Sequence, residues 1–228
     1  MLKISGESLA GDNEQGFDFD ILNDLSQNIK ILADKNLSIS IVLGGGNFIR
    51  GSSFSNGIVD RVTSDYMGML GTVMNSLALQ SNLEKIGVPS RVMSAISINR
   101  VAEPYIKNKA TRHLEKKRVV IFASGTGNPF FSTDTAAVLR ASEMKSDVIL
   151  KGTKVDGIYD KDPLNYNDAK KISEISYSDY LNKDLKVMDA TAISLAKDRK
   201  LPIFIFSIMN SSNIIDIIEG KGSYSIIK

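Results

Sequence analysis

Residues 119–129 read VVIFASGTGNP, five apolar residues that stop abruptly at a turn rich in glycine. The run Val119–Ala123 is continuously apolar rather than alternating, which is typical of a parallel strand buried on both faces. Further apolar runs occur at 38–43, 147–151 and 203–207, and segments with helical spacing lie between them at 19–32, 59–85 and 133–145. This alternation predicts an α/β sandwich with a mainly parallel sheet, formed by residues 1–228 as one domain.

The composition is that of an ordinary globular protein, and it excludes several kinds of chemistry. The 28 lysines and arginines nearly balance the 26 aspartates and glutamates, so the net charge of +2 argues against a polybasic nucleic-acid binder. The absence of cysteine and the single histidine, His113, exclude disulfides, thiolate nucleophiles and mechanisms that need two histidines. The sequence contains no apolar run near the ~18 residues of a membrane span and no signal-peptide pattern. We therefore expect a soluble, cytoplasmic protein, with His113 solvated on its surface.

Three predicted strands end in loops that are rich in glycine. These loops are Ser5-Gly6, Gly44-Gly45-Gly46-Asn47 and Ser124-Gly125-Thr126-Gly127-Asn128. One such loop alone is consistent with a simple tight turn. Three of them at strand ends favour a phosphate site, because ligands of α/β folds bind beyond the carboxyl ends of the strands and glycine lets a backbone approach phosphate closely.

Two common nucleotide motifs do not fit these loops. Ser52 stands where the P-loop frame that starts at Gly46 requires a lysine. Ile49 and Phe130 stand where the dinucleotide-binding motif requires its third glycine. The sequence therefore predicts a phosphate site that is neither a P-loop nor a dinucleotide fold.

Charged residues beside the loops are candidates for phosphate chemistry. Lys3 is either an edge-strand lysine that points to water or an ammonium held over a phosphate. Arg50 follows the second loop and can donate two N–H groups to phosphate oxygens. Asp134 lies at the start of a predicted helix, where a carboxylate can simply favour the helix dipole.

A second group of candidates lies on or after helical and strand segments. Asp65 shares a predicted helix with Gly68 and Gly71, and two glycines in a helix suggest close helix packing or a ligand that crosses the backbone. Tyr159 follows the turn signal Asp156-Gly157, and its ring could stack on a base.

Several of these motifs together resemble the bacterial uridylate (UMP) kinases of the amino acid kinase superfamily. The resemblance spans nearly the whole chain, and its most specific stretch is TGNPFFSTD at 126–134. The other matching stretches are KISGE at 3–7, GGGN at 44–47 followed by Arg50-Gly51, DYMGML at 65–70, VMSAI at 92–96, KGTKVDG at 151–157 and LKVMD at 185–189.

The resemblance implies a three-layer α/β/α sandwich of the amino acid kinase type. It implies transfer of the ATP γ-phosphoryl group to UMP, with Mg²⁺ bound to the nucleotide and with no metal held by the protein alone. The residues implied to bind ATP are Lys3, Ile4, Ser5, Gly6, Gly46, Arg50, Thr153, Tyr159 and Asp162. Those implied to bind UMP are Gly45, Asp65, Thr126, Gly127, Asn128, Pro129, Phe130, Phe131, Ser132 and Thr133. Similar enzymes are homohexamers, are activated by GTP and inhibited by UTP, and serve pyrimidine nucleotide synthesis.

The candidate residues fit this chemistry. A UMP phosphate oxygen is already anionic at neutral pH, so transfer needs alignment and charge stabilisation rather than a strong base. Lys3 and Arg50 would supply positive charge as catalytic residues, and Asp134 would orient Lys3 rather than accept a proton.

Two rival functions share some of these features. Another amino acid kinase, acting on a carboxylate or a carbamate, would have the same glycine loops but not Asp65 with the 126–133 stretch. A nucleotide-sensing module would bind without turnover. The segment 11–16 differs from the part of the family linked to GTP activation. The family usually carries an additional stretch before the lysine at position 3. We therefore expect either that the true start lies upstream or that neighbouring strands alone support the strand of Lys3.

Overall fold

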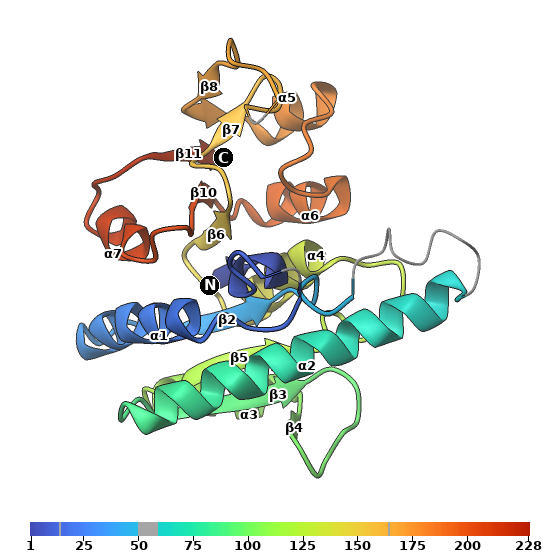
Figure 1. Ribbon diagram of the computed structural model, residues 1–228, viewed down its shortest axis with the longest axis vertical. Helices are drawn as coiled ribbons and strands as arrows, with labels where there is room; N and C mark the ends of the chain where they lie inside the picture. The colour runs from blue at the N-terminus through green and yellow to red at the C-terminus, as the bar shows by residue number, and fades with distance from the viewer. Residues whose placement is uncertain (14, 50–58, 164) are drawn as a thin grey trace.

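The computed structural model describes residues 1–13, 15–49, 59–163 and 165–228. Its main feature is a nine-stranded sheet in the order β4-β3-β5-β2-β1-β6-β10-β11-β9 (Figure 1). The strands of this sheet are β1 (Leu2–Ile4), β2 (Ser40–Leu43), β3 (Ser90–Ser94), β4 (Glu103–Pro104), β5 (Val119–Ala123), β6 (Ile149–Thr153), β9 (Glu174–Ile175), β10 (Ile203–Ser207) and β11 (Tyr224–Ile227).

Parallel pairing dominates the sheet, as the continuous apolar runs predict. Among the described strand pairs of this sheet, only β10 and β11 run antiparallel. The central strands β2, β5 and β6 are almost wholly buried because helices cover both of their faces. The expected fold class, a three-layer α/β/α sandwich with a mainly parallel sheet, is therefore confirmed.

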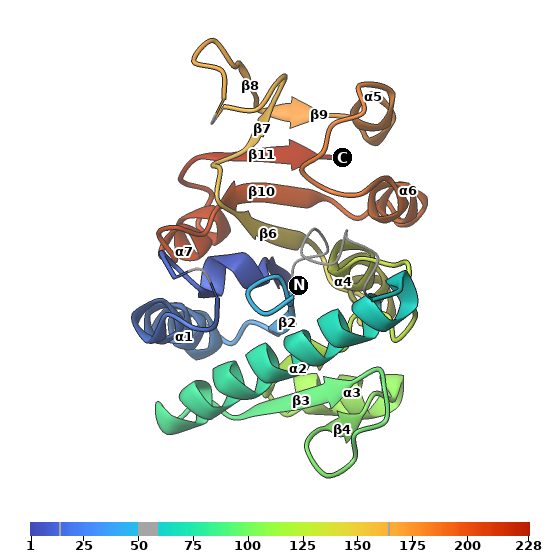
Figure 2. The same ribbon diagram turned by 45° about the vertical axis from the view of Figure 1, so that its right-hand side comes forward.

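Helices form a layer on each side of the sheet (Figure 2). Helices α1 (Phe19–Asp34), α2 (Arg61–Lys85) and α7 (Asn213–Ile218) pack in one cluster, with Leu25, Ile29 and Leu79 fully or almost fully buried. Helices α3 (Lys107–Glu115), α4 (Thr133–Glu143), α5 (Tyr177–Asn182) and α6 (Ala190–Arg199) contribute to the clusters on the other face. Each buried leucine or isoleucine contributes about 1.5–3 kcal/mol to folding, so these two layers hold the sheet in place.

Strand β1 lies at the centre of the sheet, between β2 and β6. Successive side chains of a strand point to opposite faces. Leu2 and Ile4 therefore join the α1 and α2 cluster, and Lys3 points toward α4 on the other face. The alternative of an edge lysine exposed to water is wrong, because Lys3 is only 6% exposed.

Local capping explains where the helix that carries Asp65 begins. Asp60 precedes α2, and its Oδ1 accepts hydrogen bonds from the amides of Val62 and Thr63 at 3.0 and 3.1 Å.

Across the described residues, no helix is both long and apolar enough to cross a membrane.

Two features differ from the sequence-based expectations. The small hairpin of β7 (Ile158–Tyr159) and β8 (Lys171–Ile172) was not expected, because strands of two residues leave no periodic signal. His113 is not solvated: its side chain is 13% exposed, with Nε2 3.2 Å from Glu103 and Nδ1 3.1 Å from Arg118.

Candidate active site

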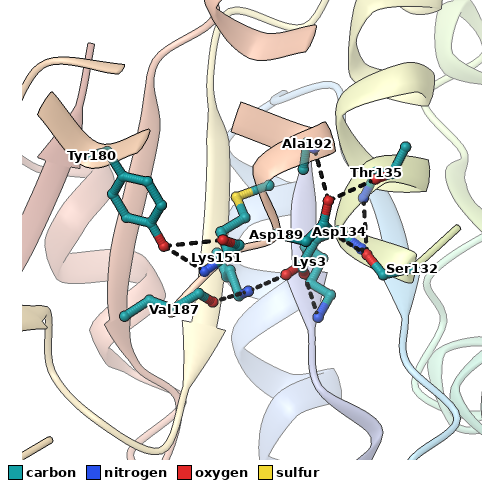
Figure 3. Close-up of polar contacts among 10 residues, drawn as sticks. Lys3, Ser132, Asp134, Thr135, Lys151, Tyr180, Val187, Asp189 and Ala192 are labelled. Atoms are coloured by element: carbon teal, nitrogen blue, oxygen red, sulfur yellow. Dashed lines mark hydrogen bonds and ion pairs between the residues drawn. The ribbon is translucent and has the colours of Figure 1, made fainter. Parts of the chain in front are cut away.

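Three buried charges meet on the α4 face of the sheet (Figure 3). Lys3 on β1 and Lys151 on β6 are direct neighbours across the two parallel strands. Both ammonium groups face Asp134 in the first turn of α4, with Lys3 Nζ 2.7 Å from Oδ1 and Lys151 Nζ hydrogen-bonded to Oδ2. Lys3 and Lys151 are each 6% exposed and Asp134 is 9% exposed.

The electrostatics of this cluster keep Asp134 and Lys151 charged near neutral pH. Burial acts to raise the pKa of Asp134, but the charges of Lys3 and Lys151 outweigh it and lower this pKa to about 2. Burial lowers the pKa of Lys151 to about 8, and the charge of Asp134 offsets part of that effect. Two cations then share one anion, so the cluster has a net charge of +1 and attracts an anionic ligand.

Two helix N-termini support the cluster. Ser132 caps α4 by accepting hydrogen bonds from the amides of Asp134 and Thr135 at 3.0 and 3.3 Å. The Ser132 hydroxyl donates to one oxygen of Asp189. The other oxygen of Asp189 accepts from the Thr135 hydroxyl at 3.0 Å and from the Ala192 amide at 2.8 Å, and the second of these bonds caps α6. The positive ends of both helices therefore lie beside the buried charges.

The backbone before α6 is fixed on Lys151. Lys151 Nζ donates to the carbonyl of Val187. The Tyr180 hydroxyl accepts from the Met188 amide at 2.6 Å and lies 3.1 Å from the Met188 carbonyl, so one tyrosine holds the segment between α5 and α6 (Figure 3).

A pocket of about 170 Å³ lies on one side of the cluster. Asp65 on α2 reaches into it, and its Oδ2 accepts a hydrogen bond from the amide of Phe130 at 2.7 Å. Arg61 Nε lies 2.9 and 3.0 Å from the two oxygens of Asp65. The lining residues are Gly45, Gly46, Ile49, Ser64, Asp65, Gly68, Met69, Thr72, Gly125, Thr126, Phe131, Ser132 and Thr133. We call this space the Asp65 pocket.

A second pocket, of about 390 Å³, lies between the β7 region and the segment before α6. Tyr159 lines it, and its hydroxyl donates to Asp156 Oδ1 at 2.6 Å. Asp156 Oδ2 is 2.8 Å from Lys171 Nζ, and hydrogen bonds from Lys171, Tyr159 and Ser223 outweigh burial and lower the pKa of Asp156. We call this space the Tyr159 pocket.

A third pocket, of about 410 Å³, joins the cluster to both of these spaces. It is lined by Asp134 and shares Ser132 with the Asp65 pocket. It shares residues 184–186 with the Tyr159 pocket. The three pockets therefore adjoin one another through shared lining residues, and we call them together the cleft. Of the three charged residues, Asp134 lines the cleft, whereas Lys3 and Lys151 lie behind it.

The described part of the cleft offers no set of protein ligands for a metal ion. Among the residues that the structure describes, no three carboxylate or histidine side chains converge as a metal site. Both oxygens of Asp134 face lysines. This arrangement fits an ion held mainly by nucleotide phosphates and water, which is the usual binding mode of Mg²⁺ in phosphoryl transfer.

The structure brings about half of the predicted site residues to this cleft. Asp162 and Tyr159 line the Tyr159 pocket, and Gly46 lines the Asp65 pocket together with Gly45. Arg50 lies outside the described residues. The residues that line none of the three pockets are Lys3, Ile4, Ser5, Gly6, Gly127, Asn128, Pro129, Phe130 and Thr153.

Three of these residues, Ile4, Gly6 and Thr153, make structural contacts in the core or in the loops. The Ile4 side chain is fully buried in the core, and its carbonyl accepts from the Gly44 amide at 2.8 Å. Gly6 packs against the second glycine loop, since a Cβ on it would lie 2.6 Å from the Gly44 carbonyl oxygen. The Thr153 hydroxyl closes a turn with Val155.

Sequence reasoning missed the roles of Lys151, Asp189 and Tyr180 in this cluster. The signal for Lys151 is the one that drew attention to Lys3, a lysine in an apolar strand beside a glycine. Asp189 and Tyr180 show no comparable signal, because their contacts join residues of separate elements.

Comparison with known proteins places the chain in a family. Residues 1–207 match the model of the amino acid kinase family. The structure of UMP kinase from Ureaplasma parvum is 38% identical with a TM-score of 0.95, and the match covers 100% of this chain and 97% of that one. UMP kinase from Bacillus anthracis is 37% identical with a TM-score of 0.95, covering 100% and 94% of the two chains. Uridylate kinase from Archaeoglobus fulgidus, at 23% identity and a TM-score of 0.76 over 100% and 99%, shares the fold. The chain belongs to the amino acid kinase family.

Proposed function

We propose that this protein is a UMP kinase, which transfers the γ-phosphoryl group of ATP to UMP and releases UDP and ADP, with residues 1–228 acting as one domain. The observation that carries the proposal is the Lys3–Asp134–Lys151 cluster, because its Asp134 lines the pocket that adjoins both the Asp65 pocket and the Tyr159 pocket. The similarity to two bacterial UMP kinases over the full chain supports the choice of UMP as acceptor.

The chemistry follows from the charges of the cleft. UMP in the Asp65 pocket and ATP in the Tyr159 pocket would bring the acceptor oxygen and the γ-phosphoryl group together at Lys3 and Lys151. Charge on the oxygens of the moving group is then stabilised by two fixed ammonium groups, which need no reorganisation during the reaction. Magnesium bound to the nucleotide phosphates would supply further charge neutralisation.

Asp134 orients the two lysines and does not act as a base. Its pKa of about 2 makes it a poor proton acceptor at neutral pH. A phosphate acceptor arrives ionised and needs no base, whereas a hydroxyl acceptor would. The low pKa of Asp134 therefore agrees with an acceptor that is already anionic.

The assembly and regulation of the enzyme are part of the same proposal. Val62, Tyr66, Leu70 and Met74 recur every four residues on α2 and are all exposed, which makes an apolar stripe along one helix. We propose that this stripe packs against a second copy in a homohexamer that GTP activates and UTP inhibits. A role in cytoplasmic pyrimidine nucleotide synthesis remains a prediction. Light scattering should show an oligomer for the wild type and smaller species for Leu70→Glu.

An acceptor screen tests the function. ADP release is measured with ATP, Mg²⁺ and UMP, CMP, glutamate or carbamate, and we expect turnover with UMP well above the others. Asp134→Asn should lose most of this turnover, and Lys154→Met, which removes an exposed lysine three residues beyond Lys151, should not. Preference for glutamate or carbamate would support the rival kinase, and UMP binding without ADP release would support a sensor.

A further inference from the structure

Two buried asparagines form a reciprocal amide pair behind the Asp65 pocket. Asn75 Nδ2 donates to Asn47 Oδ1 at 2.7 Å, and Asn47 Nδ2 donates to Asn75 Oδ1 at 2.9 Å. Asn75 Nδ2 also donates to the Gly44 carbonyl at 2.6 Å, and Asn47 Nδ2 to the Gly16 carbonyl at 2.8 Å. All four amide hydrogens thus have acceptors, although Asn47 is 1% exposed and Asn75 is 0% exposed.

The pair fixes the second glycine loop on helix α2. The Gly44 amide is already held by the Ile4 carbonyl at 2.8 Å, so Gly44 is tied to β1 on one side and to Asn75 on the other. Next to it, Gly45 lies against the backbone of α2: a Cβ on Gly45 would be 2.5 Å from the Gly68 carbonyl oxygen. A Cβ on Gly71 would be 3.3 Å from the Gly45 carbonyl oxygen, so the glycines of α2 serve close packing.

The same helix holds the third glycine loop and the pocket carboxylate. The Thr72 hydroxyl accepts from the Ser124 amide at 2.7 Å and donates to the Met69 carbonyl at 2.6 Å. Asp65 lies ten residues before Asn75, or about 15 Å along the helix. One rigid element therefore sets the relative positions of Asp65 and two glycine loops.

Stability alone does not explain a buried amide pair at this place. Apolar residues of similar size in a core are commonly as stabilising as buried polar partners. Polar partners differ because their directional hydrogen bonds fix one arrangement of the groups that they join. The direction here is toward the carbonyl of Gly44, beside the glycines that line the Asp65 pocket.

We propose that Asn75 is a positioning residue for phosphoryl transfer, which acts through Asn47 and Gly44 to hold the second glycine loop in register with Asp65. The inference rests on the proposed function, since it assigns the Asp65 pocket to the acceptor. Asn75 does not line that pocket, so its effect reaches the acceptor only through the loop.

The test compares Asn75→Leu with Ser76→Ala. Ser76 is the next residue of α2, equally buried, and its hydroxyl donates only to the Thr72 carbonyl of the same helix. We measure kcat, the KM values for UMP and ATP, the UMP Kd by calorimetry, and Tm, with kinetics at 25 °C. Asn75→Leu should lower kcat/KM for UMP about 10- to 100-fold, because a misplacement near 1 Å can cost about 100-fold. The KM for ATP should stay within about threefold, and Ser76→Ala should resemble the wild type.

Each outcome has one meaning. Wild-type kinetics in folded Asn75→Leu, or equal losses in Ser76→Ala, would overturn the positioning role. If Asn75→Leu does not fold, Asn75→Asp decides in the same way, because it keeps an acceptor for Asn47 Nδ2 but loses the hydrogen bonds donated to the Gly44 carbonyl and to Asn47 Oδ1. If the wild type does not phosphorylate UMP, the proposed function is wrong, but the positioning role of Asn75 can still be tested. Asn75→Leu and Ser76→Ala are then compared by their Kd values and by their kinetics with the acceptor that the screen identifies.

Discussion

Replacing Lys151 by methionine should separate catalysis from stability. The substitution keeps an unbranched side chain of similar length and removes one positive charge from the buried cluster. Asp134 retains its ion pair with Lys3 at 2.7 Å, so no buried charge is left without a partner. The net charge of the cluster falls from +1 to zero, and the attraction for phosphate falls with it.

The two expected effects differ in sign. Removing one preorganised charge from a site of this kind typically costs about 2.7–4 kcal/mol of transition-state stabilisation, so kcat should fall about 10²- to 10³-fold. The free energy of unfolding at pH 7 should stay equal or rise, because the lowered pKa of Lys151 shows that burial disfavours its ammonium more than Asp134 favours it. A slightly higher Tm with a much lower kcat is the expected signature.

The assay is initial-rate ADP release with UMP at saturating ATP, together with thermal unfolding. Lys154→Met is the matched control, since it removes an exposed lysine from the same segment and leaves Asp134 untouched. A kcat for Lys151→Met within about threefold of the wild type would refute the role of this charge. A large fall in Tm would refute the reasoning about its burial.

Further predictions concern the titration of Lys151 and other residues of the cleft. As pH rises through about 8, deprotonation of Lys151 should lower kcat in a pH–rate profile, and this alkaline limb should vanish in Lys151→Met. The pKa of Lys151 is about 8 in the folded protein and 10.5 in the unfolded chain. Between these pH values only the unfolded chain keeps the proton, so the contribution of Lys151 to the free energy of unfolding should rise with pH, as urea titrations would show. Asp65→Ala should raise the KM for UMP about tenfold or more, because the substitution removes a carboxylate from the Asp65 pocket and leaves the Phe130 amide without its acceptor. The KM for ATP should change less. Gly45→Ala should lower the free energy of unfolding by about 1–3 kcal/mol, because the new Cβ would collide with the Gly68 carbonyl. Gly68→Ala should raise it by up to about 1 kcal/mol, because its Cβ meets nothing within 4 Å and alanine favours the helix. Thermal unfolding measures both changes.

The parts of the fold that could be predicted are those with local signals. A continuous apolar run such as Val119–Ala123 identifies a buried strand without any knowledge of its neighbours. The helical segment expected at 59–85 corresponds to α2, which begins two residues later at Arg61. Lys3 was a candidate because it lies in an apolar strand that leads into a glycine loop and matches the family motif, and the structure places it beside Asp134.

The remaining parts depend on contacts between distant residues. The position of β1 at the centre of the sheet follows from its pairing with β2 and β6, about 40 and 150 residues away, and nothing in a three-residue strand reveals it. His113 lies in a basic stretch, yet Glu103 and Arg118 cover it, because β4 brings the glutamate back onto α3. Such partners can be assigned only when the strand order is known.

The pairing of β1 with β6 also explains why the cluster has the wrong charge balance for a structural ion pair. Two lysines on adjacent strands of a buried sheet repel each other, and one carboxylate cannot neutralise both. The depressed pKa of Lys151 reflects the resulting cost of burial. A residue pattern that only stabilised the fold would place an apolar side chain at one of these positions, as the neighbouring strand does with Val42 beside Lys3. The excess positive charge is therefore what a site for an anionic ligand requires, and we predict that nucleotide phosphate at the carboxyl edge of the sheet supplies the compensating negative charge.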